Sequence, residues 1–218
     1  MKNYLEILKK CPLFYGIEDE NLLRMLNCLG AKIIFFDKKY TVFREGDKIK
    51  HIGIVLLGSV QITQVDFYGN RSILNSVEPS QVFGEAFACA ETDFLPVSAI
   101  ANEPSYIMLI DCTHILHTCT NNCCFHQQLI FNLMKDLARK TILFHQKMEI
   151  CSKRTTRDKL LAYLDIQEKK FGKEFTIPYD RQELADYLEV DRSELSLEIS
   201  KLRAEGILES RKNFFHLL

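Results

Sequence analysis

The sequence predicts an α+β fold in three successive parts: a domain of short β-strands, one long helix and a compact domain of shorter helices. Turn-forming glycines separate β-branched and aromatic runs between about Ala31 and Ile110, a pattern typical of a sandwich or barrel-like roll. Near Asn121 the apolar spacing changes from every second residue to every third or fourth, which indicates a long helix. After Arg157 the composition changes again and short helical patterns follow.

The composition is that of an ordinary globular protein. The chain has 218 residues, of which 47% are hydrophobic and 26% charged, and its net charge is −1, so it is long enough for two modest cores. The sequence has neither an apolar run of the ~20 residues that a membrane helix needs nor the pattern of a signal peptide at its start. We therefore expect a cytoplasmic protein whose eight cysteines are reduced.

The predicted long helix carries two apolar stripes. One consists of Leu129, Leu133, Ile142 and Leu143 and is suited to packing against the β domain. The other advances in alternating steps of four and three residues, which is the seam of a coiled coil and predicts pairing with a second copy of the chain. The alternative is that the seam also packs on the β domain. The seam comprises Ile130, Met134, Leu137, Thr141, Phe144, Met148 and Cys151.

Two helix starts follow one another in the C-terminal part. Asp180 precedes Glu183 by three residues, and Asp191 precedes Glu194 in the same way, which is the spacing of capping boxes. A tight connection near Glu189 separates the two helices. Two capped helices at this spacing predict a helix-turn-helix.

The second of these helices has a core face and an exposed face. Leu195, Ile199 and Leu202 recur at i, i+4 and i+7 and are expected to be buried. On the opposite face we expect DNA contacts, with an arginine suited to guanine and a leucine suited to a thymine methyl. The predicted DNA-reading residues are Arg192, Ser193, Ser196, Leu197 and Ser200.

The local charge favours an alternative interpretation. Residues Arg181 to Gly206 include four basic and seven acidic side chains, whereas DNA binding draws on lysine and arginine contacts to phosphate. The alternative is an effector-binding signalling module whose helices contact another protein. No Ser/His/Asp, Walker or Rossmann arrangement is present, so an enzyme is not expected.

The whole chain resembles the Crp/Fnr family of regulators, typified by the cAMP receptor protein and the oxygen sensor FNR. The resemblance implies a β-roll sensor domain, like a cyclic-nucleotide-binding jelly roll, over residues 1–118, a dimerisation helix over 119–151 and a winged helix-turn-helix over 152–218. It further implies a homodimer on a near-palindromic DNA site, with RNA polymerase as a partner. The matching segments are Phe43–Asp47, Val55–Ile62, Gly69, Phe83–Glu85, Arg181–Ala185, Asp191–Ser193 and Leu202–Leu208, the last leading into a wing near Asn213.

The resemblance also assigns roles to residues. Arg192, Ser193 and Ser196 stand where the family reads bases, and Arg181 stands where the family touches phosphate, at a helix N-terminus suited to an anion. Leu197 replaces a second arginine that family members commonly carry. The family's consensus half-site is therefore not transferred to this chain.

The effector pocket departs further from the family's cyclic-nucleotide binders. There, a Gly-Glu pair opens a helix that holds the phosphate, and an arginine followed by serine closes the site. Here Val97 stands at the arginine position, and Ile142 and Leu143 stand where hydroxyl residues contact adenine. Loss of the charged phosphate contact argues against cAMP and leaves a small-molecule effector unidentified. The predicted pocket residues are Gly84, Glu85, Ala86, Val97, Ser98, Ile142 and Leu143.

A cluster of histidines and cysteines precedes the long helix. His114, His117, Cys119 and Cys123 are weak candidates for a metal or redox site, although their spacing fits no standard zinc module and packing is the alternative. An iron–sulfur sensor needs a cysteine cluster before the β-roll, where only Cys11 and Cys28 lie. No cofactor is therefore assigned with certainty from the sequence.

Overall fold

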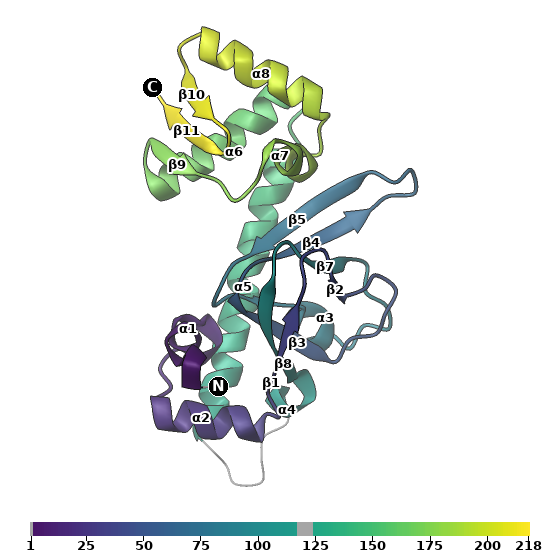
Figure 1. Cartoon of the computed structure of the whole chain (residues 1–218), viewed down its shortest axis with the longest axis vertical. Coiled ribbons are helices and arrows are strands. Elements are labelled where there is room, and N and C mark those ends of the chain that lie inside the picture. Colours follow the sequence, from purple (N-terminus) through teal and green to yellow (C-terminus); the bar gives the residue numbers. More distant parts are fainter. Residues whose placement is uncertain (1, 117–123) are drawn as a thin grey trace. The chain divides into compact units, whose positions relative to one another are not determined.

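The computed structural model describes residues 2–116 and 124–218, which form two compact units (Figure 1). The first unit comprises Met1–Val65 and Leu74–Thr141, and the second comprises Asp66–Ile73 and Ile142–Leu218. In the described part of the chain, no helix is both long enough and apolar enough to cross a membrane.

The β-strands of the first unit form two four-stranded sheets, which confirms the predicted β-roll. In the first sheet, β3 pairs antiparallel with β8, so that Ile52 lies opposite Ile110 and Ile54 opposite Met108. These four side chains are fully buried. The first sheet has the order β1 (Lys32–Phe36), β8 (Ser105–Asp111), β3 (His51–Leu57) and β6 (Val82–Phe83), and the second has the order β2 (Thr41–Phe43), β7 (Ser98–Ala101), β4 (Val60–Val65) and β5 (Arg71–Val77).

Short helices complete the first unit. Leu8 and Leu26 are fully buried in one core with Leu129 and Leu133 of the long helix. The sequence analysis did not predict the two helices that precede the β-roll. The helices before the long helix are α1 (Leu5–Lys10), α2 (Asp19–Cys28), α3 (Glu85–Cys89) and α4 (Cys112–Leu116), together with the 3-10 turns η1 (Lys2–Tyr4) and η2 (Pro12–Phe14).

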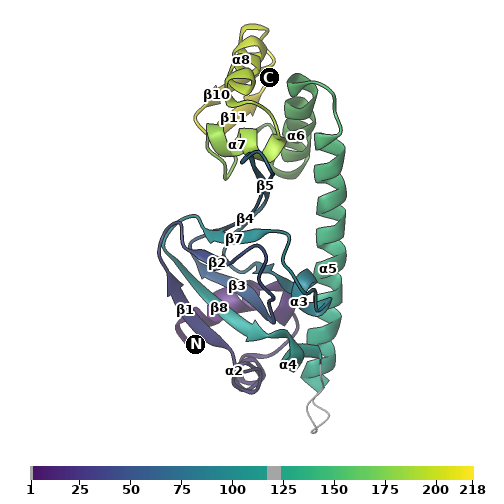
Figure 2. The same cartoon turned by 90° about the vertical axis from the view of Figure 1, so that its right-hand side faces the viewer.

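The long helix, α5 (Cys124–Cys151), is continuous over 28 residues (Figure 2). Only half of the stripe predicted to pack on the β domain does so. Leu129 and Leu133 are buried, whereas Ile142 is 60% exposed and Leu143 is 56% exposed. The prediction was wrong for the second pair because the first unit ends at Thr141, so that its core packs against only the first part of α5.

The second unit contains the predicted winged helix-turn-helix. Its helices are α6 (Thr156–Phe171), α7 (Arg181–Leu188) and α8 (Arg192–Ala204), and its strands are β9 (Glu174–Thr176), β10 (Leu208–Arg211) and β11 (Phe214–Leu217). The strands form one sheet in the order β10-β11-β9, and the hairpin between β10 and β11 is the wing. Leu184 of α7, Leu195 of α8 and Phe215 of β11 meet in the core of this unit.

Candidate nucleic-acid interface and effector cassette

Side-chain caps position the two helices of the helix-turn-helix. The Asp180 carboxylate accepts from the Glu183 amide at 2.8 Å, and the Glu183 carboxylate accepts from the Asp180 amide at 2.8 Å, so the predicted capping box of α7 is confirmed. Asp191 caps α8 by accepting from the amides of Ser193 and Glu194. Among the described contacts, α8 has no reciprocal bond from the Glu194 side chain, so its cap is simpler than the predicted box. The connection between the helices turns through Glu189, whose φ is +54°.

The two faces of α8 follow the predicted pattern. Leu195, Ile199 and Leu202 are between 0% and 3% exposed and anchor the helix in the core. On the other side, Arg192 is exposed and Leu197 is 55% exposed. The helix therefore presents a charged N-terminal turn and an apolar side chain at its surface.

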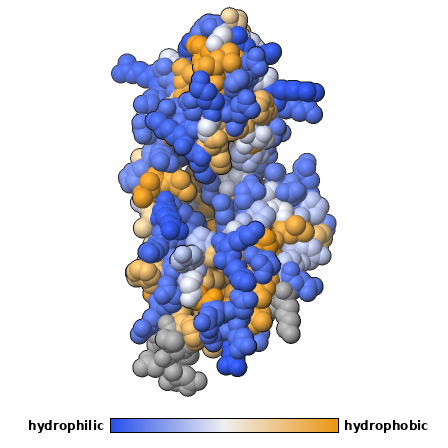
Figure 3. All heavy atoms as spheres, turned by 90° about the vertical axis from the view of Figure 1, so that its left-hand side faces the viewer, coloured by the Kyte–Doolittle hydropathy of each residue, from blue (hydrophilic) through white to orange (hydrophobic). Residues whose placement is uncertain are grey.

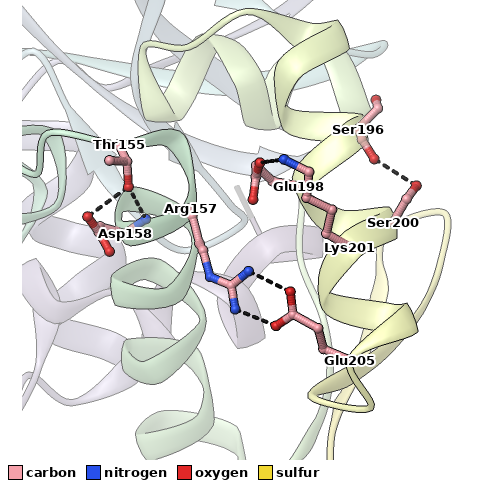
Figure 4. Close-up of polar contacts among 8 residues, drawn as sticks. All are labelled: Thr155, Arg157, Asp158, Ser196, Glu198, Ser200, Lys201 and Glu205. Atoms are coloured by element: carbon pink, nitrogen blue, oxygen red, sulfur yellow. Dashed lines mark hydrogen bonds and ion pairs between the residues drawn. The ribbon is translucent and has the colours of Figure 1, made fainter.

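The serine hydroxyls of α8 are engaged within the helix. The Ser196 hydroxyl donates to the Arg192 carbonyl at 2.9 Å. The Ser200 hydroxyl donates to the Ser196 carbonyl at 2.9 Å (Figure 4). The Ser193 hydroxyl donates to the Asp191 carboxylate. In this arrangement the hydroxyl oxygens retain acceptor capacity, which suits the amino groups of cytosine and adenine.

Basic side chains gather at the N-termini of α7 and α8. Arg181, Arg192 and Lys212 line a hollow of about 590 Å³, together with the acidic Asp180 and Glu183 and with Asn213 of the wing. Arg181 donates to the Lys212 carbonyl at 3.3 Å, and its guanidinium lies 5.7 Å from the centre of the Phe215 ring. Burial and the neighbouring charge of Arg192 lower the pKa of Arg181. Arg181 begins α7 and Arg192 begins α8, so an anion there would relieve their mutual repulsion, whereas the two carboxylates that line the same hollow oppose an anion.

The acidic residues counted in the sequence include some with partners inside the second unit. Glu205 accepts two hydrogen bonds from Arg157 at 2.9 and 2.5 Å, which tie the end of α8 to the start of α6 (Figure 4). Glu198 lies 2.5 Å from the ammonium of Lys201. Arg157 lies outside the segment Arg181–Gly206, so its pair with Glu205 offsets one of the seven acidic charges, whereas Lys201 is already among the four basic residues counted there.

The predicted pocket residues of the first unit, here called the effector cassette, are Gly84, Glu85, Ala86, Val97 and Ser98. They include one partner of a buried ion pair that was not predicted from the sequence. The Lys140 ammonium donates to the Glu85 carboxylate and to the Val82 carbonyl, both at 2.7 Å, and lies 3.1 Å from Asp136. Glu85 is only 4% exposed. Lys140 reaches this site from α5, 55 residues after Glu85 in the sequence.

The remaining cassette residues occupy different environments. Gly84 has a φ of +79°, and a Cβ there would lie 2.9 Å from the Phe43 ring, so the turn into α3 requires glycine. Val97 is 7% exposed, and the Ser98 hydroxyl accepts from the Glu45 amide at 3.0 Å. Ala86 is exposed. The other two predicted pocket residues, Ile142 and Leu143, belong to the second unit.

The predicted metal candidates lie mostly outside the described residues. His117, Cys119 and Cys123 fall in the segment 117–123, whose structure is not described. His114 donates from Nδ1 to the Leu29 carbonyl at 3.2 Å, and His126 donates from Nε2 to the Ile115 carbonyl at 2.7 Å. Within the described ranges, no group of three histidine, cysteine, aspartate or glutamate side chains is arranged to hold a metal ion.

The seam predicted along α5 is largely exposed. Met134 is 55%, Phe144 is 50% and Met148 is 67% exposed, and Thr141 is exposed as well. Leu137 packs partly against the core of the first unit, and Ile130 and Cys151 are partly buried. On the face drawn in Figure 3, apolar patches interrupt a mostly hydrophilic surface. The exposed large apolar residues of α5 are Phe131, Met134, Ile142, Leu143, Phe144 and Met148.

Comparisons with known proteins agree with both units. A cyclic nucleotide-binding domain matches residues 33–122, and a Crp-like helix-turn-helix domain matches residues 158–218. The chain is 24% identical over 205 residues to the transcriptional activator protein FnrA of Stutzerimonas stutzeri, and the match covers 91% of this chain and 80% of FnrA. It is 24% identical over 186 residues to the transcriptional activator protein FnrL of Cereibacter sphaeroides, covering 77% of this chain and 68% of FnrL.

Solved structures share the same fold. The c-di-GMP responsive global regulator CLP of Xanthomonas campestris has a TM-score of 0.73 at 18% identity, with 89% of this chain and 98% of CLP covered. FixK2 from Bradyrhizobium japonicum has a TM-score of 0.68 at 18% identity, with 86% of this chain and 92% of FixK2 covered. A cyclic-nucleotide-binding β domain, a long helix and a Crp-like helix-turn-helix are thus joined in one chain, which belongs to the Crp/Fnr family of transcription regulators.

Proposed function

We propose that this regulator acts as a homodimer that reads a near-palindromic DNA site through α8, under the control of a small-molecule effector other than cAMP. The observation that carries the proposal is the position of Arg192 in the first turn of the capped α8, where it lines one hollow with Arg181 and Lys212. Arginine at this position matches the two acceptors of guanine in the major groove. Arg181, at the N-terminus of α7, is suited to a backbone phosphate.

The remaining exposed face of α8 supports base reading. Leu197 is 55% exposed and is suited to a thymine methyl. Ser193, Ser196 and Ser200 are small enough for close approach of the helix to the base edges, and their oxygens accept hydrogen bonds.

The dimer proposal rests on the exposed seam of α5. Met134, Phe144 and Met148 repeat with coiled-coil spacing, and each exposes half or more of its side chain. Pairing of two α5 helices would remove these side chains from water. In family members of this design the two reading helices are set about one DNA turn apart, roughly 34 Å, and the bound dimer contacts RNA polymerase. Since its target is DNA, we place the regulator in the cytoplasm.

The effector proposal rests on the charges of the cassette. The position that holds the phosphate-binding arginine in cyclic-nucleotide binders is Val97, which is buried. The carboxylate available to a ribose hydroxyl is that of Glu85, and it already accepts from Lys140 at 2.7 Å. A cyclic nucleotide would have to bind its phosphate without the usual arginine and share a carboxylate that Lys140 already neutralises, so an effector of different chemistry is favoured.

Base reading by Arg192 is tested by alanine substitution. Arg192→Ala should weaken binding to the preferred duplex by about 1–3 kcal/mol, the contribution of a bidentate base contact, and should weaken binding to random duplex much less. Arg203→Ala, which removes the same charge from the last turn of α8, is the matched control and should weaken both duplexes equally. Equal losses in Arg192→Ala, measured by fluorescence anisotropy, would contradict base reading.

The dimer seam is tested by sedimentation. Phe144→Asp places a charge on the seam and should convert the dimer into a monomer, because a buried unpaired carboxylate is costly. Phe171→Asp is the matched control, since Phe171 is 55% exposed at the end of α6, away from the seam. A Phe144→Asp variant that sediments as a dimer would refute the seam.

A further inference from the structure

Two cysteines from separate short helices meet inside the first unit. Sγ of Cys89, the last residue of α3, lies 3.2 Å from Sγ of Cys112, the first residue of α4. Both are free thiols, and a disulfide bond requires the two sulfur atoms to approach to about 2.05 Å. A further approach of roughly one ångström would therefore join them.

The environments of the two thiols differ in the way that a reactive pair requires. Cys89 is partly exposed, whereas Cys112 is 1% exposed. The hydrogen bond from Cys112 lowers the pKa of Cys89, and the same contact together with burial raises the pKa of Cys112. The accessible sulfur is thus the better nucleophile and the buried one is placed to resolve it.

The other cysteines of the described part lack this combination. Burial raises the pKa of Cys11 to about 12, and burial likewise raises the pKa of Cys151. Cys28 is exposed but has no second sulfur among its described contacts.

We propose that Cys89 and Cys112 form a redox site that takes a hydroperoxide and closes to an intramolecular disulfide. The Cys89 thiolate, whose proton has passed to solvent, attacks the terminal oxygen of the hydroperoxide and breaks the O–O bond. The leaving alkoxide takes up one proton from solvent and departs as an alcohol (water when the oxidant is hydrogen peroxide), and Cys89 is left as a sulfenic acid. The Cys112 sulfur then attacks the sulfenic sulfur of Cys89, so that the S–S bond forms and the S–O bond breaks. The leaving hydroxide takes the Cys112 proton and departs as one water. The two thiols lose two electrons in total, and the hydroperoxide gains them.

The disulfide would join α3, which begins with Glu85, to α4, which contacts the first turn of α5. The start of α3 is already held to α5 through Glu85 and Lys140. The end of α4 is held to α5 through the Ile115 carbonyl and His126. Both contacts lie within the first unit, beside α5 (Figure 2). A disulfide between Cys89, at the end of α3, and Cys112, at the start of α4, would join the two helices at the ends that these contacts with α5 do not hold. It would thereby restrain α3, the helix that carries Glu85.

The test uses the reduced full-length chain and hydrogen peroxide. One equivalent of peroxide should consume two of the eight thiols. After alkylation and digestion, mass spectrometry should find the peptide containing Cys89 linked to the peptide containing Cys112, and dithiothreitol should reverse the linkage. Peroxide that modifies Cys28 or other cysteines while Cys89 and Cys112 remain open to alkylation would overturn the proposal.

Two variants and one control separate the roles of the thiols. Cys112→Ser should leave Cys89 as a sulfenic acid that dimedone traps, and Cys89→Ser should abolish reaction at Cys112. Cys28→Ser should form the disulfide as the wild type does. In the oxidised wild type, hydrogen exchange of residues 85–90 should slow by roughly tenfold or more, as expected when a disulfide restrains a local opening. Unchanged exchange in the oxidised chain would refute the restraint on α3.

Discussion

Replacing Lys140 by methionine removes the cation from a cluster of buried carboxylates. The Glu85 side chain is 5% exposed and the Asp136 side chain 9% exposed, and both lie within 3.1 Å of the Lys140 ammonium. Among the described residues, Glu85 Oε2 has no hydrogen-bond partner, so the variant would leave the Glu85 carboxylate without a charge partner. Removing one member of a buried ion pair costs about 3–5 kcal/mol, which corresponds to a fall of roughly 6–20 °C in the Tm of the first unit.

The loss is measured by urea unfolding and by hydrogen exchange of the core strands β3 and β8, which report on the first unit. Lys135→Met is the matched control, because Lys135 is exposed and lies over the Phe131 ring at 4.6 Å; its effect should stay within about 0.5 kcal/mol. Adding Glu85→Gln to Lys140→Met should recover part of the loss, since a neutral amide needs no counter-charge. A loss below about 1 kcal/mol for Lys140→Met, or no recovery in the double variant, would refute the ion pair as a stabilising element.

Two further substitutions test the local structure of each unit. Gly58→Ala places a Cβ against the Ser105 hydroxyl at a φ of +83°, and should lower the free energy of unfolding by roughly 2–5 kcal/mol. The control is Gly69→Ala, which has a φ of +85° and open space around the added Cβ, and should lower the free energy of unfolding by only about 1–2 kcal/mol. Equal losses for the two variants in thermal unfolding would contradict the steric argument. Asp180→Ala removes the cap of α7 and should lower the free energy of unfolding by about 1 kcal/mol, whereas Asp180→Asn should retain most of that stability. The measurement is urea unfolding of the second unit. Equal stability of the two variants would show that the cap contributes little.

The faces and caps of the helix-turn-helix were predictable because their determinants are local. The i, i+4, i+7 spacing of Leu195, Ile199 and Leu202 assigns the buried side of α8 without reference to any other element. The spacing of Asp180 and Glu183 specifies a capping box in the same way. The structure confirms both features.

The contacts of the effector cassette were not predictable in this way. The ion pair between Lys140 and Glu85 joins residues 55 positions apart, and Cys89 and Cys112 are 23 positions apart. Such pairs depend on how α5 and the β-roll pack, which periodicity along one segment does not specify. The exposure of Ile142 arises from the same cause, because where the packing of the first unit on α5 ends is a tertiary property.

The sequence contains a local pattern for the second of the N-terminal helices, α2. In α2, Leu22, Met25 and Leu26 repeat at helical spacing and are buried, and Asp19 and Glu20 occupy its first turn. Acidic residues there favour a helix N-terminus. This local pattern is sufficient to predict α2 from the sequence.

Selection of duplexes from a random DNA pool tests the central claim most directly. The reduced, ligand-free chain is used at about 150 mM salt, where non-specific binding is already weak, and Arg192→Ala is selected in parallel. The account predicts a palindromic motif with a guanine in each half-site for the wild type and loss of preference at that guanine for the variant. Selection of a motif that Arg192→Ala retains unchanged would contradict sequence reading by α8.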